Sequence, residues 1–495
     1  MSLPRVPQPQ ATASAGGLLV ALGVFLTHVP FLLPGYGTDT DTWKFADAIR
    51  EMSETGRYTA SRLPGYPVME FLCAPLARAG PWAPNALSAV AAAACAWLSG
   101  RLFARHGVRD AGLAGAAFAF VPAAFIAGTS SIDYLWAIAF GLAAWLEARD
   151  GRGARAGLWF GLAIATRLTS VLFGPSLLIL LAAAPGGSRA RRWGACCGLS
   201  AAVSVACYLP AFQRYGWLTF TYSEISGGQS SAVRFLTGMV RGGDPGVPWS
   251  LIAGQATVLL LGLMGSAAVA GVLLSLLWQR RLAPRAARID RATLLAVGSL
   301  VLLEGAFYLR LPHDEGYLLP VVPFVMLALA AFVTLGRFRT VCAAFLLAPF
   351  LLGVDVEPPK KGATPGRPSP ASLRLGVGGE TVVVEPWRGP LLRDRAKRVA
   401  MREMADQVER WWPTRPPRFL MAAGNLTSML YYLFPEPPRE RHIQKAYPPA
   451  ERERARLEGT PIFALPDAAR RMAKAEGVRA IPGLVPLAAG PRTTP

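Results

Sequence analysis

The sequence predicts a polytopic α-helical membrane protein of about 11 membrane segments, followed by a soluble α/β domain at the C-terminus. Of its 495 residues, 52% are hydrophobic and only 17% are charged, whereas a soluble globular protein carries about 25% charged residues. The mean hydropathy is +0.33. The apolar residues gather in runs of about 18 to 25 residues, the length that a helix needs to cross roughly 30 Å of hydrocarbon. These observations argue against a purely soluble protein.

The expected membrane segments follow one another from near the N-terminus to residue 353. They lie at about 16–34, 84–104, 112–129, 132–148, 157–167, 171–184, 194–212, 251–278, 292–311, 316–335 and 338–353. The two segments between 157 and 184 are short. We expect them to be two short helices that turn at Arg167–Ser170 near the outer side, because a single span would carry the arginine-rich loop 186–192 to the outside.

Residues 1–353 therefore form the expected membrane domain, with a long first external loop at 35–83. A linker is expected at 354–370, because the Pro-Pro-Lys-Lys stretch and the prolines and glycines after it interrupt any regular pattern. Residues 371–495 form the expected external soluble domain, in which strands alternate with helices as in a small α/β layer. Its strands are predicted at 381–384, 418–421 and 461–465, and its helices at 393–412, from 425 and at 467–476. Because it lacks clustered acids, we expect it to bind the acceptor or to act as a scaffold.

The chain is strongly basic, with 51 Lys and Arg against 31 Asp and Glu and a net charge of +20. Such an excess is typical of nucleic-acid binding or of a membrane protein with basic loops. The arginines cluster in short loops at 101–109, 149–155, 189–192, 280–288 and 337–339. The positive-inside rule places these loops in the cytoplasm, so nucleic acid is not needed to explain the charge. We expect a multi-pass protein of the plasma (inner) membrane with its C-terminal domain on the external, periplasmic side.

Several kinds of chemistry have no support in the sequence. The six cysteines lie in or beside apolar segments, and none lies in the C-terminal domain, so no disulfide framework is indicated. No CxxC, HExxH, GxxxxGK[ST] or dinucleotide-binding glycine motif occurs. We therefore expect no required cofactor and predict no metal ligands, although a divalent metal stays open.

The first external loop carries two candidate catalytic carboxylates, Asp39 and Asp41. From Trp43 to Met52 apolar residues recur at helical spacing, which predicts a short amphipathic helix lying flat on the outer membrane surface. The alternative interpretation is that Thr40 or Asp41 caps this helix. Two acids at the end of the first membrane segment, followed by basic and aromatic residues, favour a chemical role.

Further candidates stand at the same outer face. Arg62 and Tyr66 lie in the turn Ser61–Pro67, which returns the chain to the membrane and in which a guanidinium is suited to bind an anion at head-group depth. Arg167 interrupts an apolar stretch, and a charge there usually marks a functional site or an interhelical ion pair. Asp133 could cap a helix. His313 and Glu315 could form a polar turn, yet all of these residues project to one face of the membrane.

The stretch 35–72 resembles the first external loop of the GT-C superfamily of integral-membrane glycosyltransferases, which includes protein O-mannosyltransferases and lipid A aminoarabinose transferases. Residues 41–46 and 49–52 fit the frame of that loop, and Asp41 falls on the leading acid of the family. Thr42 replaces the second acid, and Asp39 supplies a carboxylate two residues earlier. Residues 313–320 and 161–167 resemble two weaker family segments, so the resemblance covers about 16–335.

This resemblance implies transfer of a sugar from a polyprenyl-phosphate donor to a glycan, lipid or protein acceptor at the external face, with inversion. Asp41 would act as general base and Asp39 as its partner or substitute. Arg62 and Arg167 would hold the departing lipid phosphate, with Tyr66 and Asp133 beside it. His313 and Glu315 would orient the donor or the acceptor.

Two other classes of function remain as alternatives. A transporter or flippase of lipid-linked sugars would show internal repeats and broken helices that meet at the membrane midplane. The two halves of the sequence show no clear repeat. A non-catalytic membrane scaffold or sensor would use the soluble domain as its working part, but it leaves the external carboxylates and arginines unexplained.

Overall fold

The computed structural model places most of the membrane domain and part of the C-terminal domain. It describes residues 12–216, 271–272, 274–275, 286–310, 315–357, 373–377, 380–386, 389–414, 420–423, 427–434, 443–444, 451, 454–455, 457–458, 460, 462–465 and 478–480. The expected segment 251–278 falls almost entirely outside these residues, as do His313 and the expected helix at 467–476.

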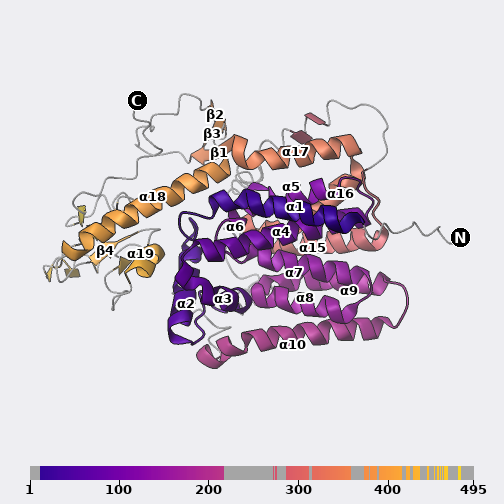
Figure 1. Ribbon diagram of the computed structural model, residues 1–495, viewed down its shortest axis with the longest axis horizontal. Coiled ribbons are helices and arrows are strands. Elements are labelled where there is room, and N and C mark those ends of the chain that lie inside the picture. The colour runs from indigo at the N-terminus through magenta and orange to yellow at the C-terminus, as the bar shows by residue number, and fades with distance from the viewer. Residues whose placement is uncertain are drawn as a thin grey trace.

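A bundle of helices forms the larger part of the described fold (Figure 1). Its helices are α1 Thr12–His28, α4 Trp82–Arg105, α5 Ala111–Ala119, α6 Pro122–Gly128, α7 Tyr134–Arg149, α8 Gly153–Thr166, α9 Gly174–Ala183, α10 Arg189–Tyr215, α15 Arg291–Arg310, α16 Val322–Phe332 and α17 Leu335–Leu351. Short 3₁₀ helices, η1 Val29–Phe31, η3 Leu168–Phe173 and η6 Glu315–Val321, lead out of α1 and into α9 and α16. These elements follow the expected segments closely.

Among the described helices, three are long and apolar enough to cross a membrane: α4, α10 and Arg291–Leu309 of α15. The expected segment 112–129 is not one straight helix, because α5 and α6 meet at an angle of 72°. Pro122 begins α6 and has no N–H to continue the ladder of α5, which explains the break. The helices α8 and α9, joined by η3, form the two short helices expected between 157 and 184. The total of about 11 segments stays a prediction.

Small residues let the helices of the bundle approach closely. A Cβ atom at Gly115 of α5 would lie 2.2 Å from the Ala96 carbonyl oxygen of α4, and one at Gly157 of α8 would lie 2.5 Å from the Cys196 carbonyl oxygen of α10. Neither position can hold a larger residue without moving a backbone. This is how membrane helices gain packing contacts, since apolar side chains alone do not distinguish protein from lipid.

Residues 35–83, expected to be the first external loop and called so below, include α2 Thr40–Thr55, α3 Pro67–Cys73 and η2 Ala74–Ala79. The amphipathic helix lies where the sequence predicts it, and its position flat on the membrane surface stays a prediction, but its apolar face is covered by protein. Trp43, Phe45, Ile49 and Met52 are all buried inside the protein. They pack with α3, η2 and the helix α19 Thr427–Leu433, because an apolar face can be covered by protein as well as by lipid.

The C-terminal part contains two small sheets and one long helix. Strands β1 Leu352–Glu357, β3 Glu380–Pro386 and β2 Leu373–Val377 form an antiparallel sheet in that order. Strand β1 occupies the beginning of the expected linker, so a linker starting at 354 is wrong. Four short parallel strands form the second sheet in the order β5 Ile443–Gln444, β4 Leu420–Ala422, β6 Ile462–Ala464 and β7 Val478–Ala480.

The long helix α18, Pro390–Trp411, joins the C-terminal part to the bundle (Figure 1). The Arg398 guanidinium donates hydrogen bonds to the carbonyl oxygen and the hydroxyl of Thr129, at 2.6 and 3.0 Å. Asp394 accepts a 2.9 Å bond from the Thr38 hydroxyl in the first external loop. The C-terminal part therefore rests on the loops that carry the candidate site.

Candidate active site

Four charged side chains from separate parts of the chain form one network. Arg62 is hydrogen-bonded to Asp41 and lies 3.9 Å from the carboxylate of Asp133. Arg167 donates a 2.7 Å hydrogen bond to the other oxygen of Asp133. The order of charges along the network is therefore Asp41, Arg62, Asp133, Arg167. Alternation of sign lets these groups share a poorly hydrated site, since each buried charge has an opposite neighbour.

The position of Arg167 follows from a break in the chain between α8 and η3. Its backbone is extended, at φ −152° and ψ 114°, and it ends α8. The side chain is buried and lies over the rings of Tyr134 and Tyr317, at 3.9 and 5.1 Å from guanidinium carbon to ring centroid. Glu304 of α15 also interacts with it electrostatically. A buried guanidinium needs such partners.

Glu70 orders the loop that presents Arg62 and Tyr66. It is fully buried in α3 and accepts four hydrogen bonds: from the Tyr58 hydroxyl at 2.5 Å, from the Ser61 amide and hydroxyl at 2.8 and 2.7 Å, and from the Tyr66 amide at 3.0 Å. Arg62 in turn lies over the ring of Tyr66, 4.8 Å from its centroid. Sequence reasoning missed Glu70. The sequence signal for it was an acidic residue among apolar residues directly after a proline-rich turn, since an acid at a buried position usually has hydrogen-bond partners.

The two candidate bases have different environments. Asp39 is the N-cap of α2, and its carboxylate accepts a 2.8 Å hydrogen bond from the Asp41 amide. The prediction that Thr40 or Asp41 would be the cap is wrong by one or two residues. The carboxylate of Asp41 points instead to Arg62 and to Lys44, whose Nζ lies at 3.3 Å. The Asp41 side chain is 25% exposed, so an incoming hydroxyl can reach it.

Asp133 immediately precedes α7 but makes no side-chain capping hydrogen bond. The alternative that it only caps a helix is therefore wrong, since its two oxygens face Arg62 and Arg167. Of the remaining candidates, His313 lies outside the described residues. Glu315 begins η6, and only its backbone is described. Tyr317, two residues later, contacts Arg167 and was not predicted.

A small pocket opens at the centre of this network. Its lining consists of Asp41, Phe45, Ser61, Arg62, Tyr66, Met69, Ser131, Ile132 and Asp133. The pocket thus joins a reachable carboxylate to a guanidinium and to hydroxyl and aromatic groups. Such a surface can accept a proton at Asp41 and hold an anionic oxygen at Arg62.

The protein environment raises the pKa of Arg62. Burial alone would lower the pKa of its guanidinium, but the neighbouring Tyr66, Asp41 and Asp133 outweigh this effect and raise it above its usual value. Burial raises the pKa of Glu70, whereas the hydrogen bonds that it accepts act in the opposite direction. Arg62 therefore stays a permanent cation at the pocket. Within the described ranges, no group of three or more His, Cys, Asp or Glu side chains is placed to hold a metal ion.

Comparison with known proteins bears on the fold and on the class of protein. Residues 66–303 match the sequence model of Glycosyltransferase family 87. The structure of ArnT from Cupriavidus metallidurans in the apo state superposes with a TM-score of 0.52 over 94% of this chain and 95% of that one, at 14% identity. The resemblance to GT-C glycosyltransferases is confirmed. The fold is therefore similar to that of ArnT.

A second structure, of the same ArnT bound to undecaprenyl phosphate, is similar with a TM-score of 0.42 and 16% identity, covering 93% of this chain and 94% of that one. A search of curated protein sequences found no match. In this chain the junction of α8 and η3 places Arg167 against Asp133, whose other oxygen faces Arg62. The roles of these residues are considered next.

Proposed function

We propose that this chain transfers a sugar from a polyprenyl-phosphate donor to an acceptor hydroxyl at the external face of the membrane. The single observation that carries the proposal is the pocket in which the partly exposed carboxylate of Asp41 adjoins Arg62, with Asp133 and Arg167 behind it. Glycosyl transfer from a lipid phosphate needs both a base and cations for the leaving group. The glycosyltransferase family match supports the reaction class.

In the proposed reaction the acceptor oxygen attacks the anomeric carbon while its proton passes to Asp41. The bond from the anomeric carbon to the phosphate oxygen breaks, and its electron pair stays on the lipid phosphate. Arg62 and Arg167 stabilise the charge that develops there, since guanidinium groups bind phosphate through two parallel hydrogen bonds. A single displacement of this kind inverts the anomeric centre.

Asp133 has a positioning role in this proposal. It holds Arg62 and Arg167 from one side, so that both guanidinium groups are oriented before the donor arrives. Asp39 has no direct role, because its carboxylate caps α2. Tyr66 packs against Arg62 and limits its movement. His313 and Glu315 stay candidates for orienting the donor or the acceptor.

The proposed reaction needs no divalent metal, because two arginines supply the positive charge at the phosphate. Equal transfer rates in EDTA and in added magnesium or manganese are the expected result. A rate that falls in EDTA and recovers with one metal would contradict this part of the proposal.

The proposed location is the inner membrane, with the pocket and the C-terminal part on the periplasmic side. Loop charge supports this orientation, since the arginine-rich loops lie at the opposite end of the bundle. Labelling of single introduced cysteines in intact cells, at Ser53 in α2 and at Arg152 in the opposite loop, tests it. We expect a membrane-impermeant thiol reagent to label position 53 and not position 152.

The decisive experiment measures sugar transfer by the purified full chain. A panel of radiolabelled undecaprenyl-phosphate hexoses and pentoses serves as donor, with extracted envelope lipids and glycans as acceptors. Asp41→Asn should lower the rate by roughly 100-fold or more. Asp47→Asn, in the same helix but outside the pocket, is the matched control and should stay near wild type. Full activity of Asp41→Asn would disprove the base assignment, and no transfer from any donor by wild type would disprove the function.

A further inference from the structure

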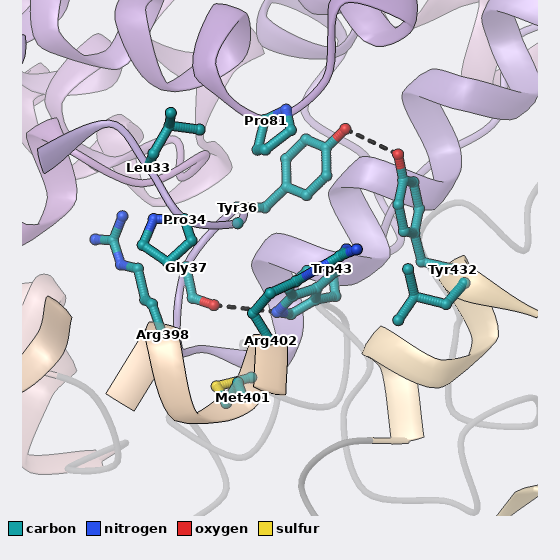
Figure 2. A pocket seen from close by; sticks show the side chains of 12 residues that line it. Leu33, Pro34, Tyr36, Gly37, Trp43, Pro81, Arg398, Met401, Arg402 and Tyr432 are labelled. Atoms are coloured by element: carbon teal, nitrogen blue, oxygen red, sulfur yellow. Dashed lines mark hydrogen bonds between the residues drawn. The ribbon is translucent and has the colours of Figure 1, made fainter. Parts of the chain in front are cut away.

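A second, larger pocket lies where the C-terminal part meets the first external loop. Its volume is about 310 Å³, the lower end of the range found for ligand sites. Figure 2 shows that the chain around Leu33–Gly37 forms one side, while Arg398, Met401 and Arg402 of α18 form the opposite side. Trp43 and Tyr432 complete an aromatic wall. The lining is thus mainly apolar, with guanidinium groups on one side.

This pocket is separate from the one that contains Asp41. No residue lines both pockets. The Trp43 indole donates a 3.0 Å hydrogen bond to the Gly37 carbonyl oxygen, and the Tyr36 carbonyl oxygen accepts a 2.9 Å bond from the Ser131 amide. The chain between the two pockets is therefore fixed at Tyr36 and Gly37. A ligand in the second pocket would not touch the proposed catalytic groups.

An exposed apolar stripe on α1 leads to the mouth of this pocket. Its residues are Leu18, Leu22, Leu26, Val29 and Leu33, which are between 45% and 59% exposed. The spacing of the first four places them along one face of α1 and η1, and Leu33 follows two residues after η1. Leu33 both ends the stripe and lines the pocket. A hydrocarbon chain lying along the stripe would therefore bring its polar head to the pocket.

Arginine side chains lie near the place where the polar head of such a lipid would lie. Arg402 is half exposed and forms a surface ion pair with Asp406 at 2.8 Å, which costs little to exchange for a phosphate. Arg398 is buried and shares its charge with Asp394 at 2.7 Å. The guanidinium of Arg395 lies over Phe31, at the end of the stripe, 5.8 Å from its ring centroid. The pocket thus pairs an apolar approach with a basic wall.

We propose that this pocket binds the head group of an anionic phospholipid whose acyl chain lies on the α1 stripe. Arg402 contacts the phosphate, and Tyr36, Trp43 and Met401 surround the glycerol region. The bound lipid would fill the seam between α18 and the first external loop. It thereby stabilises the docking of the C-terminal part without taking part in sugar transfer.

Native mass spectrometry of the purified, delipidated full chain tests this proposal. The probes are phosphatidylglycerol, phosphatidylcholine with the same acyl chains, and inorganic phosphate. We expect wild type to retain phosphatidylglycerol in preference to phosphatidylcholine. Arg402→Gln should weaken this retention roughly tenfold, and Arg410→Gln, a basic position on α18 outside the pocket, should leave it unchanged.

Leu33→Asn provides a second variant, because it interrupts the stripe without removing a charge. It should also reduce retention of phosphatidylglycerol, and thermal unfolding of each variant without lipid shows whether it is folded. Equal retention by Arg402→Gln and Arg410→Gln would overturn the proposal. Equal retention of the two lipids would overturn it as well. Thermal stabilisation by inorganic phosphate as large as that by phosphatidylglycerol would replace it with a site for a free anion.

Discussion

Arg167 donates a 2.7 Å hydrogen bond to Asp133, although the two residues are 34 positions apart in the chain. The side chains are 9% and 4% exposed. The charged form of each side chain therefore depends on the other for its stability, because an isolated charge is costly inside a membrane protein. This pair joins the break after α8 to the start of α7, and it determines where the Arg167 guanidinium can lie.

Asp133→Asn should destabilise the protein by about 3 kcal/mol, because it removes the ion-pair partner of the buried Arg167. Thermal unfolding in detergent measures the effect. Asp150→Asn is the matched control, since Asp150 pairs with Arg105 at 2.8 Å in a partly exposed position, where a pair contributes at most about 1 kcal/mol. Equal destabilisation by the two substitutions would show that burial of the Asp133 pair has no particular importance.

Substitutions of Asp39 test whether this residue only caps α2, as proposed, or acts as the general base in place of Asp41. Asp39→Asn should keep nearly the full rate of sugar transfer, because asparagine is also a good N-cap. Asp39→Ala should cost about 1 kcal/mol in unfolding free energy through the lost cap, with a small change in rate. Rate and thermal unfolding are measured side by side. If Asp39→Asn abolished transfer while the protein stayed folded, Asp39 would be the base instead.

Glu70 should affect donor binding although it does not line the pocket beside Arg62. Glu70→Ala removes the acceptor of four hydrogen bonds. The Ser61 and Tyr66 amides then lose their acceptor, and each unsatisfied amide costs about 1–3 kcal/mol of unfolding free energy. We expect a raised KM for the donor, because the loop that presents Arg62 loses its order. Glu51→Ala in α2 is the control. An unchanged KM in a folded Glu70→Ala protein would contradict the positioning role.

Stability in acid should depend on Asp290, which precedes α15. Burial alone would raise the pKa of Asp290, but hydrogen bonds from the Thr293 amide and from Arg149 lower it to about 2. Because the folded-state pKa of Asp290 lies below the ordinary aspartate value of about 3.9, its contribution to stability is present above that pH and is lost as the pH falls toward 2. Asp290→Asn should therefore reduce the loss of melting temperature between pH 5 and pH 3. An identical acid profile in wild type and variant would refute this assignment.

Hydropathy and local patterns predicted much of the fold. The α8–η3–α9 break at Arg167, the amphipathic α2 and the long α18 all lie close to where the sequence places them. Local patterns were less informative about which part of the protein, or the lipid, an apolar helix face contacts. The apolar face of α2 was expected to meet lipid, yet it meets protein, because periodicity shows that a face is buried without showing what covers it.

The sequence by itself determined that the chain is rich in apolar helices, that Asp41 and Arg62 lie in the long loop after the first of them, and that Asp133 and Arg167 lie at the ends of later ones. Only the tertiary structure decided that these four side chains alternate in one network, that Asp39 caps α2, and that Glu70 orders the Arg62 loop. The physical reason is that helix formation and membrane insertion depend on neighbouring residues, whereas the pairing of charges depends on segments brought together from distant parts of the chain.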